Sequence, residues 1–211
     1  MVNFYIKGMS TTKEEQEKIV NNFKERKINI VPIIDDYANY SIKTIIPYIE
    51  KFIKDHNPNN EEINLICHSM GCNFGYLFNK INNVDKLILV SPEFISTNSK
   101  QKKEITSNYK GVDYNTSNNS IKPNLHDMIL YYKSLKKVAG VQNNMPALSA
   151  NSLIIYSKGD PFVNQDWINS DINLLSQKIE VNSNSHNPLL TNDEIYDEIA
   201  EYIKKPLRKI R

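Results

Sequence analysis

The sequence predicts a three-layer α/β fold, in which about six mainly parallel strands lie between two layers of helices. Short apolar runs rich in β-branched and aromatic residues recur along the 211 residues. Most of these runs show little polar alternation, which is typical of parallel strands covered on both faces. Helical patterns separate them, and strands that alternate with helices form right-handed crossovers. The predicted strands span residues 2–6, 28–34, 63–67, 86–90, 152–156 and 177–181.

Helix signals support this alternation. The first helix should begin at Thr12, which has capping-box spacing to Glu15, and the last helix shows the same spacing between Thr191 and Glu194. The second helix carries isoleucines at helical intervals, so it should lie on the sheet. Its regular part is expected to begin near Pro47, because a proline beyond the first turn removes a backbone hydrogen bond.

One region interrupts the alternation. We predict a single domain over residues 1–211, with residues 95–150 as a lid or cap insertion, because this connection is far longer than usual for an α/β unit. Residues 123–140 have the pattern of an amphipathic helix. Its predicted apolar face consists of Leu125, Met128, Ile129, Tyr132 and Leu135.

Composition excludes several classes of protein. A net charge of +2, from 26 basic and 24 acidic residues, argues against a nucleic-acid-binding surface over the whole fold. The basic run at residues 204–211 is typical of a solvated chain end. Cys67 and Cys72 match neither a disulfide framework nor a zinc site, which favours a reducing, cytoplasmic location. No apolar run reaches the length of a membrane span, so we expect no stable membrane insertion.

The stretch LICHSMGCNFG, residues 65–75, places Ser69 between a predicted strand and a segment that can begin a helix. A sharp turn at this point lifts the hydroxyl above the sheet edge, and the N-terminus of the following helix favours negative charge. Gly71 supplies a small residue after the turn, and Gly75 would let the helix lie close to the sheet. Ser69 is therefore a candidate nucleophile.

This stretch resembles the nucleophile elbow of the α/β-hydrolase superfamily, as found in its small serine esterases and lipases. The superfamily pattern is G-x-S-x-G, and Cys67 replaces the first glycine here. The cysteine side chain is small, so the turn should survive. The resemblance covers nearly the whole chain in element order and implies a trimmed member without the leading antiparallel hairpin.

The resemblance also implies an acid and then a histidine after the serine. A serine hydroxyl becomes an effective nucleophile when a histidine takes its proton and a carboxylate orients that histidine. Asp160 follows the fifth predicted strand, and His186 lies in the polar loop before the last helix. We therefore predict a triad of Ser69, His186 and Asp160. Glu93, after the fourth predicted strand, is the alternative acid, because some members carry it there.

Two backbone N–H groups should hold the oxyanion of the reaction intermediate. By resemblance, Met70 supplies one, directly after the nucleophile. Met9 supplies the other, from the loop YIKGMST after the first strand, where Lys7 replaces the histidine of many members and Gly8 is retained. Gly8 and His68 are expected to line the substrate-binding site.

These residues predict a serine hydrolase that cleaves a small-molecule carboxylic ester or thioester through an acyl-enzyme on Ser69. No metal, nucleotide or other cofactor is expected, because the sequence has neither a glycine-rich phosphate loop nor a cluster of metal ligands. Two alternatives stay open. The same triad would perform acyl transfer in a site that favours an alcohol or amine over water. The changes at Cys67 and Lys7 are also compatible with a non-catalytic binding protein on the same scaffold.

Overall fold

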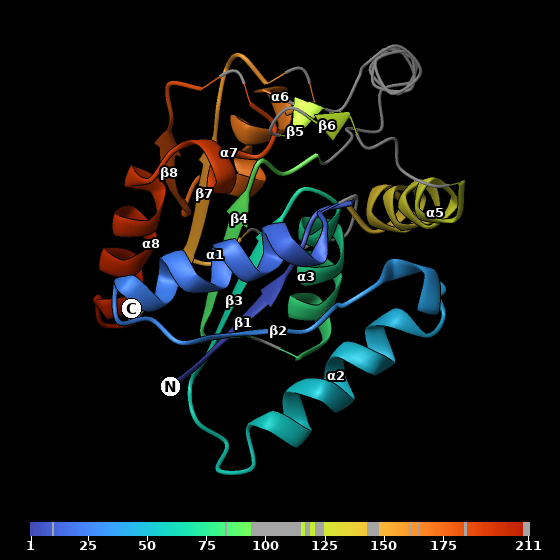
Figure 1. The fold of residues 1–211 in the computed structure, drawn as a ribbon, viewed down its shortest axis with the longest axis horizontal. Helices are drawn as coiled ribbons and strands as arrows, with labels where there is room; N and C mark the ends of the chain where they lie inside the picture. Colours follow the sequence, from blue (N-terminus) through green and yellow to red (C-terminus); the bar gives the residue numbers. More distant parts are fainter. Residues whose placement is uncertain are drawn as a thin grey trace.

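A single parallel sheet organises the molecule (Figure 1). The computed structural model describes residues 1–9, 11–82, 84–93, 115–116, 119–120, 125–142, 148–160, 162–163, 165–183 and 185–208. The sheet has six strands in the order β2-β1-β3-β4-β7-β8, and every neighbouring pair is parallel, as predicted. The strands are β1 (Val2–Ile6), β2 (Ile30–Pro32), β3 (Ile63–His68), β4 (Lys86–Val90), β7 (Ser152–Tyr156) and β8 (Gln177–Glu180).

The edge strand β2 is shorter than its apolar run predicts. The run covers residues 28–34, but the strand ends at Pro32. Proline has no N–H to donate to a ladder, and this is why it is tolerated at the edge of the sheet. Ile33 still donates its N–H to the carbonyl of Tyr5 at 2.9 Å, so the chain stays close to β1 beyond the strand.

Successive strand residues pack on opposite faces of the sheet. In β3, for example, Leu65 and Cys67 belong to one apolar cluster and Ile66 to the other. The first cluster holds α2 (Ile45–His56), α3 (Met70–Asn82) and part of α5 (Leu125–Gln142). The second holds α1 (Lys13–Glu25), α7 (Pro188–Thr191) and α8 (Glu194–Lys204). Figure 1 shows α1 crossing one face of the sheet with α8 beside it. These two cores confirm the three-layer prediction.

The first two helices begin as the sequence predicts. Thr12 and Glu15 form a complete capping box, because the Thr12 hydroxyl accepts from the Glu15 N–H and the Glu15 carboxylate accepts from the Thr12 N–H. Helix α2 begins at Ile45, so Pro47 lies in its first turn. The N–H groups of the first turn have no partner within the helix, and a proline is therefore tolerated there.

The capping box predicted for the last helix is wrong. Thr191 ends the short helix α7, and its hydroxyl donates to the carbonyl of Asn187. Helix α8 begins after it, at Glu194, whose N–H donates to the Asn192 side chain at 3.0 Å. The proline at the start of α7 had already begun a separate helical turn, which leaves Thr191 on the wrong side of the break.

The predicted insertion lies largely outside the described residues. What the structure describes of it is the small antiparallel pair β5 (Asn115–Thr116) and β6 (Asn119–Ser120), α5 and residues 148–150. The helix was predicted correctly, but its buried face was not. Leu125 and Ile129 are exposed, whereas Asp127, Leu130, Tyr131 and Ser134 are buried. Polar residues on the inner side, held against neighbouring elements, are not recognisable from an apolar pattern.

Short helical turns complete the chain. They are η1 (Tyr37–Asn39), α6 (Gln165–Ile168) and η2 (Asp171–Asn173). η1 lies against α5, where His126 contacts the carbonyls of Tyr37 and Tyr40. Within the described ranges, no helix is both long and apolar enough to span a bilayer.

Candidate active site

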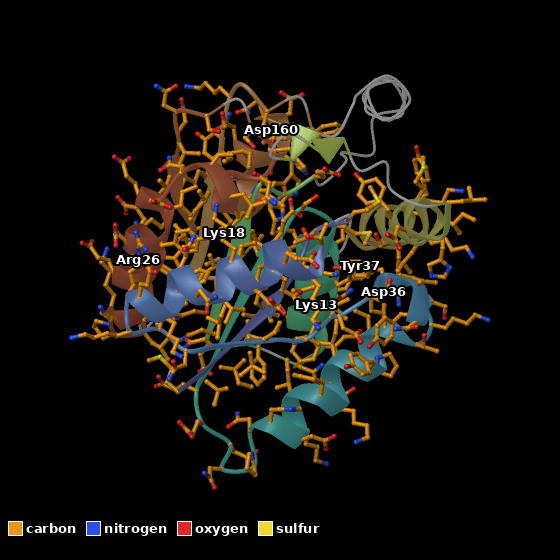
Figure 2. The ribbon with its side chains drawn as sticks, viewed as in Figure 1. Lys13, Lys18, Arg26, Asp36, Tyr37 and Asp160 are labelled. Carbon is orange, nitrogen blue, oxygen red and sulfur yellow. The ribbon has the colours of Figure 1, made fainter. Side chains whose placement is uncertain are left out.

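The candidate residues lie at one edge of the sheet, because the carboxyl ends of parallel strands meet there. Ser69 directly follows β3, Glu93 lies three residues after β4, Asp160 lies four residues after β7, and His186 lies in the loop between β8 and α7. Asp160 is labelled in Figure 2, beyond the end of β7. Sequence segments more than 100 residues apart thus contribute to one site.

Ser69 occupies a strained turn between β3 and α3. Its φ is 50°, in the left-handed region that non-glycine residues rarely adopt. The turn is fixed on both sides, because the Ser69 N–H donates to the Val90 carbonyl at 3.0 Å and its carbonyl accepts from the Cys72 N–H at 2.9 Å. Only 3% of Ser69 is exposed. This is the tight strand-to-helix turn that the sequence predicts.

Two glycines of α3 are required by close packing around this turn. A Cβ on Gly71 would lie 2.3 Å from the carbonyl oxygen of Ile6, at the end of β1. A Cβ on Gly75 would lie 2.2 Å from the Sγ of Cys67. The space behind Cys67, which replaces the usual first glycine, is therefore provided by Gly75. The change at Cys67 leaves the turn intact.

Ser69, His186 and Asp160 form a continuous chain of contacts. The Ser69 Oγ lies 2.8 Å from Nε2 of His186, and Nδ1 of the same ring lies 2.7 Å from Oδ2 of Asp160. Asp160 is 3% exposed, and the histidine side chain is 16% exposed. The three residues predicted as a triad are thus brought together in the predicted order.

The loops that hold Asp160 and His186 are stiffened by local hydrogen bonds. Oδ1 of Asp160 accepts from the Phe162 N–H at 2.9 Å, which closes a turn and leaves Oδ2 for the histidine. The Phe162 ring packs edge-on against the imidazole, with centroids 4.9 Å apart. On the other loop, the Ser185 hydroxyl accepts from the Asn187 N–H at 3.1 Å. The imidazole is therefore restrained by a carboxylate, an aromatic ring and its own turn.

Glu93 is the residue whose position the sequence did not predict. Its side chain is completely buried, and Oε1 lies 2.6 Å from Nε2 of His186 and 3.4 Å from the Ser69 Oγ. The chain turns toward the site at Ser91, which has a φ of 49°. As a substitute triad acid, Glu93 would have to contact Nδ1, which faces Asp160 instead. Its place directly after β4 was visible in the sequence, but its contact with the reacting nitrogen was not.

Two carboxylates therefore flank His186. Burial by itself lowers the pKa of this imidazole, but Asp160 and Glu93, through charge and hydrogen bonds, outweigh it and raise the pKa to about 10. A positive ring between two negative groups has both nitrogens protonated near neutral pH. In that state Nε2 cannot accept a proton from Ser69.

His68 packs beneath this histidine. Burial, followed by the nearby charge of His186, lowers the pKa of His68 to about 3, so the ring is neutral. Its Nε2–H donates to the carbonyl of His186 at 2.9 Å. The side of the ring that carries Nδ1 faces Gly8, where a Cβ would lie 2.6 Å from that nitrogen. His68 thus anchors the backbone of His186, and its predicted contact with substrate stays a prediction.

The predicted oxyanion loop lies beside the serine. A Cβ on Gly8 would lie 3.0 Å from the Cβ of Ser69, so the loop backbone approaches the nucleophile as closely as glycine allows. The loop is held by Lys7, which is buried and donates from Nζ to the Thr11 and Asp35 carbonyls. The Tyr37 hydroxyl donates to the Lys7 carbonyl. Lys7 therefore ties the loop to the end of β2, a function that a neutral histidine would perform differently.

Met9 and Met70, the predicted oxyanion donors, are both buried. Met70 is the first residue of α3, and N–H groups of a first helical turn have no partner within the helix. They form the positive end of the helix dipole next to Ser69. In the described part of the chain, no group of three His, Cys, Asp or Glu side chains could hold a metal ion.

Solved structures with this arrangement come from several enzyme classes. An epoxide hydrolase from Bacillus megaterium has a TM-score of 0.68, with 15% sequence identity over 97% of this chain and 93% of that chain. A Paleococcus ferrophilus monoacylglycerol lipase has a TM-score of 0.65, with 10% identity over 95% and 93%. The RedJ thioesterase of Streptomyces coelicolor has a TM-score of 0.63, with 11% identity over 96% and 90%.

The chain has the α/β-hydrolase fold. The similar structures open epoxides or act as a lipase or thioesterase, so the fold alone does not set the reaction. No protein-family model matches this sequence, and no curated protein matches it significantly. The reaction must therefore be argued from the site.

Proposed function

We propose that this protein is a serine hydrolase that cleaves a carboxylic ester or thioester through an acyl-enzyme on Ser69. The observation that carries the proposal is the unbroken contact chain of 2.8 Å from Ser69 to His186 and 2.7 Å from His186 to Asp160. The strained backbone at Ser69 supports it, because such strain is maintained mainly where a side chain must be presented for chemistry.

In the proposed reaction, neutral His186 accepts the Ser69 proton on Nε2 while Oγ attacks the acyl carbonyl carbon. Asp160 holds Nδ1–H and stabilises the imidazolium that forms. The N–H groups of Met9 and Met70 are proposed to bind the oxyanion. His186 then returns the proton to the leaving alcohol or thiol, and water releases the acyl group by the same steps.

A covalent probe tests this proposal. The protein is exposed to a fluorophosphonate, and intact mass with peptide mapping identifies the adduct in wild type, Ser69→Ala and His186→Ala. We expect a single adduct on Ser69 that both variants lose, because the hydroxyl is activated only by its histidine. Ser41→Ala, at an exposed serine far along the chain from the site, is the matched control and should label like wild type.

The absence of any adduct on a folded protein would overturn the hydrolase proposal and favour a binding protein on this scaffold. A Ser69 adduct together with product formation that depends on an added alcohol or amine would identify an acyltransferase instead. Circular dichroism of each variant shows whether it is folded.

A further inference from the structure

The carboxylate of Glu93 lies where the acyl part of a substrate must bind. A carbonyl carbon poised for attack lies about 3 to 3.5 Å from the nucleophilic oxygen. Oε1 of Glu93 is itself 3.4 Å from that oxygen. Any acyl group that reaches Ser69 therefore meets this buried carboxylate directly.

The position of Glu93 has a cost for the proposed chemistry. A carboxylate buried without a positive partner is strongly unfavourable, and here Nε2 of His186 lies 2.6 Å from Oε1. The same nitrogen has to be unprotonated to accept the Ser69 proton. Glu93 therefore favours the form of His186 that cannot act as a base, and catalysis requires something to replace His186 in this ion pair.

We propose that Glu93 binds an ammonium group carried by the acyl part of the substrate, next to the reacting carbonyl. This inference rests on the proposed serine hydrolase function. The substrate class is then esters or thioesters of α-amino acids. When the ammonium group pairs with Glu93, the Nε2 proton of His186 passes to water, and the neutral imidazole accepts the Ser69 proton.

Simple geometry supports an α-ammonium group. Standard bond lengths place an α-nitrogen about 2.5 Å from the carbonyl carbon of the same amino acid. With that carbon in contact with the Ser69 Oγ, the nitrogen falls within the same small region as Oε1 of Glu93, 3.4 Å from Oγ. A hydrogen bond between the two is therefore possible while the carbonyl stays in place for attack.

The other charged and titratable groups around His186 agree with this selectivity. Asp160 faces Nδ1 from the loop after β7, and it adds a second negative charge to the site. His68 packs from the end of β3 and is neutral, so it contributes no positive charge. A cationic acyl group is therefore attracted, and an anionic acyl group is repelled by both carboxylates.

Three benzyl esters of nearly the same shape test the proposal. L-Alanine benzyl ester carries an ammonium group on its α-carbon, benzyl isobutyrate carries a methyl group there, and monobenzyl methylmalonate carries a carboxylate. Release of benzyl alcohol at pH 7 gives kcat/KM for each ester. We expect the alanine ester to exceed the isobutyrate by about 10- to 100-fold, the range of a charge-assisted hydrogen bond. The methylmalonate ester should be the slowest.

Glu93→Gln keeps the shape of the side chain and removes its charge. The ratio of kcat/KM between the alanine and isobutyrate esters should fall toward one in this variant, whereas Glu50→Gln, at an exposed glutamate of α2, should keep the wild-type ratio. A merely structural role of Glu93 would slow both esters equally. The wild-type preference should also fade above pH 8, because an α-amino group loses its proton near pH 7.7 to 8.0.

The two proposals fail in different ways. Equal hydrolysis of the alanine and isobutyrate esters by wild type, with no activity in Ser69→Ala, would overturn the ammonium site and leave the hydrolase in place. A Ser69 adduct without turnover of the alanine ester would do the same. Neither an adduct on Ser69 nor hydrolysis of any ester would overturn the hydrolase and the ammonium site together. The wild-type comparison keeps the test decisive even if Glu93→Gln does not fold.

Discussion

The loop after β7 and the loop after β4 each bring a buried carboxylate against the same imidazole, from opposite sides. Asp160 contacts Nδ1 of His186 at 2.7 Å, and Glu93 contacts Nε2 at 2.6 Å. The two contacts are almost equal in length, and both raise the pKa of the ring. Their consequences for catalysis are opposite, because only Nε2 exchanges a proton with Ser69.

This difference shows that charge near a general base has to be assigned to an atom before it is assigned a role. On the Nδ1 side, a carboxylate orients the ring and stabilises the imidazolium formed during attack. On the Nε2 side, it holds a proton where the serine proton must arrive. The first arrangement serves every acyl substrate, and the second favours those that bring their own cation.

The largest expected effect comes from removing the carboxylate on the Nδ1 side. Asp160→Asn should lower kcat on the alanine ester roughly 10³-fold, because the ring loses its orientation and its correct tautomer. Steady-state hydrolysis measures this loss, with Asp171→Asn in the exposed start of η2 as the control. Loss of activity below tenfold would mean that Asp160 does not orient His186.

Removing the carboxylate on the Nε2 side should change the pH profile instead. In wild type, kcat/KM for benzyl isobutyrate should rise with pH toward about 10, the pKa of His186, because only the neutral ring acts as base. Without the charge of Glu93 this pKa falls, so Glu93→Gln should reach its plateau at lower pH.

At pH 7 this shift makes Glu93→Gln faster than wild type on the uncharged ester. The experiment is a pH series of kcat/KM for both proteins on benzyl isobutyrate, corrected for spontaneous hydrolysis. Identical acidic limbs in the two profiles would show that Glu93 does not control the protonation of Nε2. Glu50→Gln should follow the wild-type curve.

The smallest expected effect lies beneath both carboxylates. His68→Leu removes the N–H that the His186 carbonyl accepts, so it should lower the free energy of unfolding by about 1 to 3 kcal/mol. Urea denaturation measures the loss. His56→Leu is a matched control, because His56 also contacts a backbone carbonyl but is exposed, and its effect should stay within about 0.5 kcal/mol. Equal losses in the two variants would remove the special role of His68.

Local sequence patterns were sufficient for the elements and for the order of the site residues. The run that becomes β3, the glycines after Ser69 and the capping box at Thr12 depend on neighbouring residues, so each could be recognised within a few positions. Where a decisive contact came from farther away, the prediction failed. The buried face of α5 and the cap of α8 are examples, because packing partners and a preceding turn decided them.

The sequence by itself therefore determined a parallel α/β sheet, a serine at a tight turn, and an acid and a histidine at later strand ends. Only the tertiary structure decided which nitrogen of His186 each carboxylate contacts. That choice depends on the angles at which three loops leave one sheet edge, and it differs by the width of a single ring. Residues up to 117 positions apart along the chain set it, so no local pattern carries the information.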